Sequence, residues 1–121
     1  MPLHGLRVLV VEDDWFLATT MEGLLRAAHA TVAGPVPSVE AGLDLLAHGP
    51  HLDAALLDVN LGGEMVYPLA DCLVVLGVPV VFATAYSRDV LPRHFAALPH
   101  LEKPVAGTEA VQAVARAAHR G

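Results

Sequence analysis

Short apolar segments of strand character alternate with segments of helical periodicity along the whole chain. The apolar segments are rich in Val, Leu and Ala, which is typical of strands buried on both faces of a parallel sheet. Strands are expected at residues 6–12, 31–36, 53–58, 78–83 and 98–102. Helices are expected at 15–28, 38–48, 64–76, within 86–99 and at 108–119. In the first of them, apolar residues recur at helical spacing and predict its apolar face: Phe16, Leu17, Met21, Leu24 and Leu25. This order predicts an α/β fold, a doubly wound five-stranded parallel sheet with right-handed crossovers and five helices on its two faces.

Several residues mark the boundaries of these elements. Pro35 lacks a backbone N–H and predicts that the second strand lies at the sheet edge or ends early. Ser38 is a favourable N-cap for the second helix, and Pro68 is tolerable in the third helix only near its first turn. The loop 59–63 contains two glycines, which permit unusual backbone angles. The segment 86–99 contains two prolines and is expected to form a short, poorly anchored helix, a candidate moving part.

Size and composition limit the classes of protein to consider. A chain of 121 residues forms one domain, and its 55% hydrophobic residues are sufficient for a buried core. The formal net charge of -6, with seven Lys and Arg in total, argues against direct nucleic-acid binding. Cys72 is the single cysteine, which excludes an intrachain disulfide, and it is expected to be a small buried side chain.

The amino terminus, residues 1–7, lacks the basic start and long apolar stretch of a signal peptide. Apolar runs stay far below the roughly 20 residues that a membrane crossing needs. We therefore expect a soluble, cytoplasmic protein that does not bind a membrane.

Polar groups of matched chemistry follow four of the expected strands. Three acids, Glu12, Asp13 and Asp14, follow the first strand, and Asp58 ends the third. Thr84 ends the fourth strand and Lys103 the fifth. Because the carboxyl ends of neighbouring parallel strands meet at one edge, these groups should share a pocket. Carboxylates about 4 Å apart repel by about 4 kcal/mol at an effective dielectric of 20, so the cluster needs Mg²⁺ and the ammonium group.

These motifs together resemble the receiver domain of two-component response regulators. The resemblance covers residues 1–121 and is carried by four motifs in order: Val-Val-Glu12-Asp13-Asp14, Leu-Leu-Asp58-Val-Asn-Leu, Phe-Ala-Thr84-Ala and Glu-Lys103-Pro104. It implies a single receiver domain with the flavodoxin-like strand order 2-1-3-4-5. The segment Phe-Ala-Thr84-Ala-Tyr86 is similar to a bacterial, single-domain subgroup whose motif reads Phe-Ala-Thr-Gly-Tyr.

The resemblance implies roles for the acids and for the loop after the third strand. Asp58 would be the phosphoacceptor, attacking the phosphorus of a phosphohistidine, and a ligand of Mg²⁺. Asp13 would bind Mg²⁺ directly and Glu12 through water. The backbone carbonyl of Asn60 would complete the protein's share of the metal site.

It also implies roles for the last two strand ends. Thr84 would donate a hydrogen bond to a phosphoryl oxygen, and Lys103, through a cis Lys103–Pro104 bond, would pair with the phosphoryl group. Many receivers carry a switch aromatic three residues before the lysine, where this chain has His100. Tyr86 is therefore a second switch candidate. The hypothesis is that phosphorylation draws Thr84 inward and reorganises the segment 86–99.

Receiver function implies a sensor histidine kinase or a histidine phosphotransfer protein as the phosphoryl donor. The output would be binding to a downstream protein or to a second copy of the chain. We do not expect an enzyme, because the chemistry would be limited to self-catalysed gain and loss of the phosphoryl group.

Two other functions compete with this one. An Mg²⁺-dependent phosphatase or phosphotransferase using an aspartyl phosphate would carry a second acid two residues after the nucleophile, where this chain has Asn60. A degenerate receiver could act as a docking surface alone, although the acids, Thr84 and Lys103 are all present. Simpler readings also apply, since Asp14 is better explained as a helix cap than as a ligand.

Overall fold

The computed structural model describes residues 2–120 as an α/β domain. The strands are β1 (Arg7–Val11), β2 (Thr31–Val36), β3 (Ala54–Leu57), β4 (Asn60–Leu61), β5 (Glu64–Met65), β6 (Val80–Thr84) and β7 (His100–Glu102). The α-helices are α1 (Trp15–Ala27), α2 (Val39–His48), α3 (Tyr67–Val75) and α4 (Gly107–Arg120). Two 3₁₀ helices, η1 (Arg88–Val90) and η2 (Arg93–Phe95), lie between β6 and β7.

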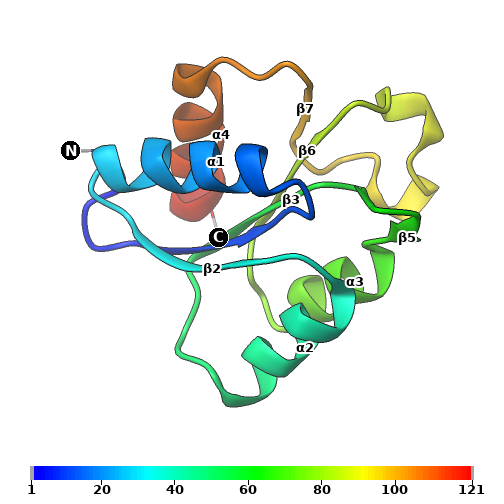
Figure 1. The fold of residues 1–121 in the computed structure, drawn as a ribbon, viewed down its shortest axis with the longest axis horizontal. Coiled ribbons are helices and arrows are strands. Elements are labelled where there is room, and N and C mark those ends of the chain that lie inside the picture. Colours follow the sequence, from blue (N-terminus) through cyan, green and yellow to red (C-terminus); the bar gives the residue numbers. More distant parts are fainter. Residues whose placement is uncertain (1, 121) are drawn as a thin grey trace.

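The main sheet has five parallel strands in the order β2-β1-β3-β6-β7. Helices α1 and α4 cover one face and α2 and α3 the other (Figure 1). This confirms the predicted doubly wound sheet of order 2-1-3-4-5. Among residues 2–120, no helix combines the length and apolar character that a membrane crossing requires.

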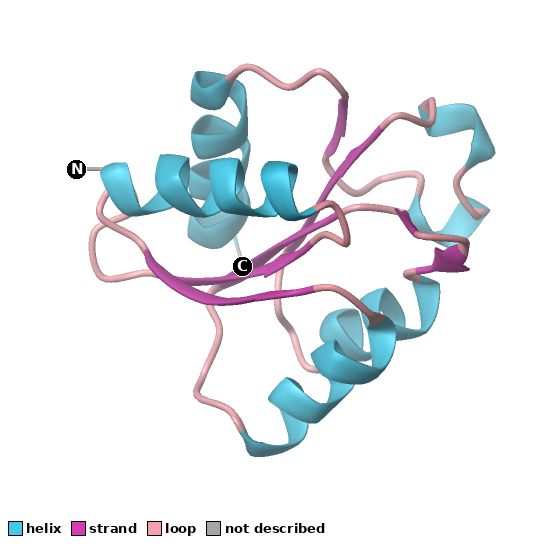
Figure 2. Ribbon diagram, in the orientation of Figure 1, coloured by secondary structure: helices cyan, strands magenta, loops and turns pink. Residues whose placement is uncertain are grey.

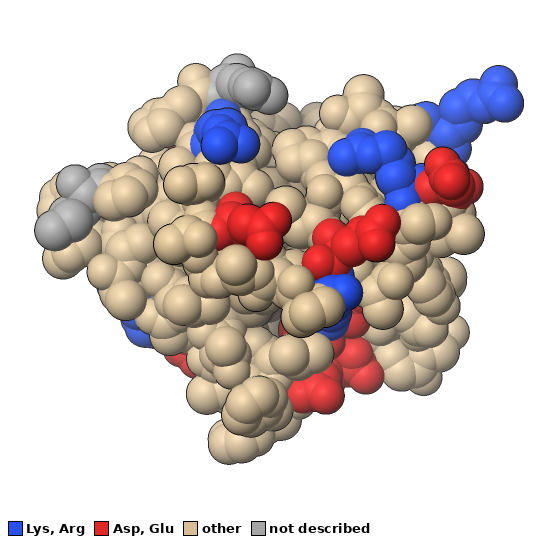
Figure 3. Space-filling view, turned by 90° about the horizontal axis from the view of Figure 1, so that it is seen from above, with Lys and Arg blue, Asp and Glu red and all other residues tan. Residues whose placement is uncertain are grey.

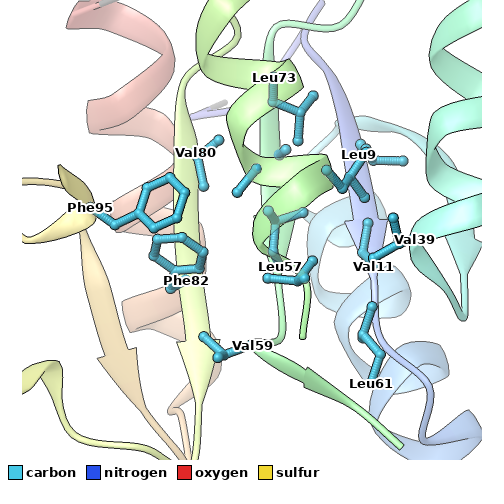
Figure 4. Packing of buried hydrophobic residues seen from close by; sticks show 14 of the residues in the cluster. Leu9, Val11, Val39, Leu57, Val59, Leu61, Leu73, Val80, Phe82 and Phe95 are labelled. Carbon is cyan, nitrogen blue, oxygen red and sulfur yellow. The ribbon is translucent and has the colours of Figure 1, made fainter. Parts of the chain in front are cut away.

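Each face of the sheet has its own core because successive strand residues point to opposite sides. On the α2/α3 face, Leu9, Leu57 and Phe82 are fully buried, and Figure 4 shows them converging with residues from α3 and from the segment after β6. On the α1/α4 face, Val8 and Val10 pack against the buried side of the two covering helices. Burial on both faces explains the near-continuous apolar strands in the sequence.

The segment between β6 and β7 differs most from the prediction. A fifth α-helix was predicted there, but the described chain has four α-helices and the two short 3₁₀ helices instead (Figure 2). Pro92 cannot donate the backbone bond that a longer helix would need. The prediction of poor anchoring is also wrong, because Leu91 and Phe95 are 8% and 1% exposed.

The loop after β3 holds a small element that the sequence analysis did not assign. β4 and β5 pair as an antiparallel hairpin through the turn Gly62-Gly63, and both glycines have positive φ, 66° and 102°. Helix α3 consequently begins at Tyr67, three residues later than predicted, with Pro68 in its first turn as expected. We call residues 60–65 the β4–β5 hairpin.

Strand β2 lies at one edge of the main sheet, as Pro35 indicated. Its register with β1 shifts between Leu9 and Val11. Gly34, with φ of 87°, allows this irregularity, because a Cβ there would lie 2.8 Å from the Val36 nitrogen. Glu12 N–H donates to the Val36 carbonyl at 3.0 Å, so the shifted register still holds the chain at the first acid.

Two residues have an exposure that their sequence context did not indicate. Cys72 is exposed, although a buried position was expected. Phe16, expected on the apolar face of the first helix, is 68% exposed, because the buried side of α1 is formed by Ala18, Met21 and Leu25.

Candidate functional site

Two of the acids lie side by side because their strands are neighbours. β1 and β3 pair with Val11 opposite Leu57, and Asp58 N–H donates to the Val11 carbonyl at 2.9 Å. Glu12 and Asp58 are the next residues on the two strands. Both are buried, with 6% and 9% exposure. Desolvating two carboxylates so close together is costly unless positive charge is present.

Three carboxylates form a group with the geometry of a metal site. Glu12, Asp13 and Asp58 each offer one oxygen, and the three oxygens lie within 4.8 Å of one another. An octahedral Mg²⁺ with bonds of about 2.1 Å places opposite ligands roughly 4.2 Å apart, so small side-chain rotations would let this set close on one ion. The donor set, all oxygen and acidic, fits Mg²⁺.

Asn60 lies two residues past Asp58, at the start of the β4–β5 hairpin. Val66 N–H donates to the Val59 carbonyl at 2.9 Å, so Val59 and Val66 form a hydrogen-bonded pair at the base of the hairpin. Antiparallel pairs alternate, so the next pair, Asn60 with Met65, is of the kind that does not exchange backbone bonds. This leaves the Asn60 carbonyl as a candidate fourth oxygen ligand.

Lys103 supplies the positive charge. Its Nζ lies 2.6 Å from Glu12 Oε1 and 3.2 Å from Asp58 Oδ2. The residue follows β7, and its backbone N–H donates to the Thr84 carbonyl at 2.8 Å, which fixes it beside β6. The Lys103–Pro104 bond is cis, as predicted. The predicted convergence of the fifth strand on the acids is therefore confirmed.

The electrostatics of the cluster follow from burial and close contact. The pKa of Glu12 is raised to about 7, chiefly by burial; the hydrogen bond from Lys103 opposes this rise, and the nearby Asp58 charge adds to it. Burial lowers the pKa of Lys103, but its contacts with Glu12 and Asp58 outweigh burial and leave it above the usual value. Near neutral pH, Lys103 is therefore charged, whereas Glu12 is present in both its protonated and its ionised form.

Asp14 does not belong to this group. It is the N-cap of α1, and its side chain accepts a hydrogen bond from Leu17 N–H at 3.0 Å. Its own N–H donates to Glu12 Oε2 at 3.2 Å and so helps to orient that carboxylate. The expectation that Asp14 caps the helix is confirmed.

The remaining predicted residues form a second group joined by hydrogen bonds. Thr84 is 2% exposed, and its Oγ1 accepts from Tyr86 N–H at 3.3 Å. The Tyr86 carbonyl accepts from His100 Nε2 at 2.9 Å, and the Tyr86 hydroxyl accepts from Asn60 Nδ2 at 2.9 Å. Both switch candidates, Tyr86 and His100, therefore contact each other next to Thr84.

Sequence reasoning did not find the side-chain contacts of the β4–β5 hairpin. Asn60 Oδ1 accepts from Gly63 N–H at 2.6 Å, and Glu64 Oε1 accepts from Val39 N–H at 3.1 Å. A Gly-Gly turn between two short segments is a hairpin signal that would have indicated the element. Nothing in the sequence pattern indicated the partners.

Charged side chains are sparse on the face seen from above. Lys and Arg lie scattered among acidic groups on a mostly uncharged surface (Figure 3). This face therefore carries no broad field of one sign.

Comparisons with known proteins place the chain in a family. A scan against models of protein families gave no match, and neither did a search of curated proteins. Among solved structures, SdrG from Sphingomonas melonis Fr1 is 36% identical, with a TM-score of 0.79 over 95% of this chain and 96% of SdrG. The receiver domain of PhyR from Erythrobacter litoralis is 22% identical, with a TM-score of 0.81 over 94% of this chain and 90% of that one.

A further match was solved with a bound metal ion. The receiver domain of the sensor histidine kinase PA1611 from Pseudomonas aeruginosa PAO1, solved with a magnesium ion in its active-site cleft, is 23% identical. Its TM-score is 0.80 over 95% of this chain and 98% of that one. The chain belongs to the receiver domains of response regulators.

Proposed function

We propose that this receiver domain accepts a phosphoryl group on Asp58 with the help of Mg²⁺. The observation that carries the proposal is the convergence of three carboxylate oxygens within 4.8 Å, with the Lys103 ammonium group bonded to two of those carboxylates. A helix cap or a solvated surface charge would not require this arrangement, because one acid suffices to cap a helix.

Each side chain has a part in the transfer. An Asp58 oxygen forms a bond to phosphorus as the bond from phosphorus to the donor's imidazole nitrogen breaks. Glu12, Asp13, Asp58 and the Asn60 carbonyl would hold Mg²⁺, which supplies positive charge beside the phosphoryl oxygens. Lys103 would pair with the phosphoryl group, and the Thr84 hydroxyl would donate to it. Lys103 is already within 3.2 Å of Asp58, so little reorganisation is needed.

The partners follow from this chemistry. The donor would be a sensor histidine kinase or a histidine phosphotransfer protein, and the output would be binding to a downstream protein or to a second copy. We propose no turnover of a separate substrate, because Asn60 stands where an aspartyl-phosphate enzyme would carry its second acid. Its amide donates to Tyr86 and cannot act as a general acid or base.

Intact-mass spectrometry of the chain incubated with acetyl phosphate tests the proposal. We expect the mass of one phosphoryl group to be added when Mg²⁺ is present, and no addition when EDTA replaces it. An unchanged mass with Mg²⁺, in a sample that binds the ion by calorimetry, would refute the proposed transfer.

The affinity for Mg²⁺ should depend on pH through Glu12. Its pKa of about 7 means that it is mostly ionised at pH 8 and mostly protonated at pH 6. Because acids near a metal act in their deprotonated form, we expect the affinity to fall by up to about tenfold from pH 8 to pH 6. Isothermal titration calorimetry measures this. In Glu12→Gln the affinity should be weaker and nearly independent of pH, and an equally steep dependence there would exclude Glu12 as the cause.

A further inference from the structure

The Asn60 side chain joins two parts of the molecule that the proposed function uses separately. Asn60 would offer its backbone carbonyl to the metal. Its side chain is held at both ends, because Oδ1 accepts from Gly63 N–H at 2.6 Å and Nδ2 donates to the Tyr86 hydroxyl at 2.9 Å. The orientation of the peptide that carries the carbonyl is therefore tied to the position of Tyr86.

The hairpin that carries Asn60 is fixed on the other sides as well. Leu61 is 6% exposed and belongs to the core on the α2/α3 face. Glu64 accepts from Val39 N–H at 3.1 Å at the start of α2, and a Cβ on Gly62 would lie 3.2 Å from Asp13 Oδ2. The hairpin thus packs against the core and lies close to a candidate metal ligand, and it has little freedom to absorb a movement of Asn60.

Tyr86, which binds the Asn60 side chain, makes hydrogen bonds to two other parts of the site. Its N–H donates to Thr84, its carbonyl accepts from His100, and its hydroxyl accepts from Asn60. Tyr86 also opens the segment 86–99, which Arg88 holds together by donating to the Ala96 and Leu98 carbonyls at 2.8 and 3.0 Å. A shift of the Tyr86 hydroxyl is therefore expected to change the packing of the segment 86–99.

We propose that Asn60 is a positioning residue whose side chain couples metal binding to the segment 86–99 through the Tyr86 hydroxyl, before any phosphoryl transfer. This inference rests on the proposed function, because it assumes that the Asn60 carbonyl is a metal ligand. Coupling between sites is reciprocal, so the Tyr86 hydroxyl must also affect the affinity for the ion. The bond holds the carbonyl in place before the ion arrives and so favours binding.

The test compares wild type with Tyr86→Phe, which removes the hydroxyl and keeps the ring. In wild type, Mg²⁺ should slow amide hydrogen exchange in residues 86–99. In Tyr86→Phe this response should be largely lost, and the affinity for Mg²⁺ by calorimetry should fall about 2- to 10-fold, as expected for one partly buried hydrogen bond. Asn60→Ala keeps the carbonyl and should give the same two effects, and the double variant should add little to either.

Tyr67→Phe is the matched control. This substitution removes the equivalent hydroxyl from the other tyrosine, whose ring centroid lies 5.6 Å from that of Phe95. The Tyr67→Phe variant should respond to Mg²⁺ as wild type does. If wild type binds Mg²⁺ without a change in exchange at 86–99, or if Tyr86→Phe responds as fully as wild type, the coupling is overturned. If wild type gives no heat of Mg²⁺ binding, the proposed function itself is refuted, because it requires the metal ion.

Discussion

Asp58→Asn should take up no phosphoryl group from acetyl phosphate. The carboxamide oxygen is a far weaker nucleophile than a carboxylate, and the predicted loss is complete by intact mass. The variant should remain folded, because losing the contact with Lys103 at 3.2 Å is offset by relief of the repulsion between Asp58 and Glu12. Circular dichroism checks the fold of the same sample.

Asp14→Asn is the matched control for this substitution. Asp14 lies next to the acid cluster in sequence but caps α1 through Leu17 N–H. Asn is an equally good N-cap, so the variant should fold and be phosphorylated as wild type is. Phosphorylation that survives in Asp58→Asn, or that is lost in Asp14→Asn, would show that the acids have been assigned to the wrong roles.

Phe95→Ala should lower the free energy of unfolding by about 3–5 kcal/mol, as expected for deleting a fully buried aromatic side chain. Phe95 is 1% exposed, and its ring lies 5.5 Å from that of Phe82 in an edge-to-face arrangement (Figure 4). It is the main anchor of η2 on the sheet. The loss should appear as a lower midpoint in urea denaturation.

Phe16→Ala is the control for this experiment. It makes the same chemical change at a residue that is 68% exposed, and its effect should stay within about 0.5 kcal/mol. Equal midpoints for Phe95→Ala and wild type would mean that the segment 86–99 is as poorly anchored as its two prolines suggested. The Phe95 ring would then contribute nothing to the core.

The sheet could be predicted because its strands are short, apolar on both faces and regularly separated by helical periodicity. Burial of Leu9 and Val10 on opposite faces of β1 requires that pattern, and few other folds produce it. The end of α1 could be placed within a residue, and the caps Asp14 and Ser38 were recognisable from side-chain chemistry alone.

The segment between β6 and β7 could not be predicted, because its structure depends on tertiary contacts. Phe95 packs on Phe82, and His94 lies 3.0 Å from Asp71 of α3. The helix and strand propensities of the residues in this segment do not indicate contacts with residues far away in the sequence. Phe16 was misplaced for a related reason, since helical spacing gives the period of an apolar stripe but leaves its exact rotation to packing.

The acid site was predictable to the residue because strand ends in a parallel sheet meet at one edge. Glu12, Asp13, Asp58 and Lys103 lie together as expected. The pairing of Asn60 with Tyr86 was not predictable, because a hydrogen bond across 26 positions leaves no periodic signal. The glycines that form the β4–β5 turn were noticed, but their role as a hairpin turn was not.

Reduction of the phosphorylated protein with borohydride tests the central claim most directly, because borohydride converts an aspartyl phosphate into homoserine and marks its position. Peptide mapping by mass spectrometry after treatment with acetyl phosphate and Mg²⁺ should find homoserine at position 58. Homoserine at another aspartate would contradict the account, as would phosphorylation that leaves Asp58 unmodified.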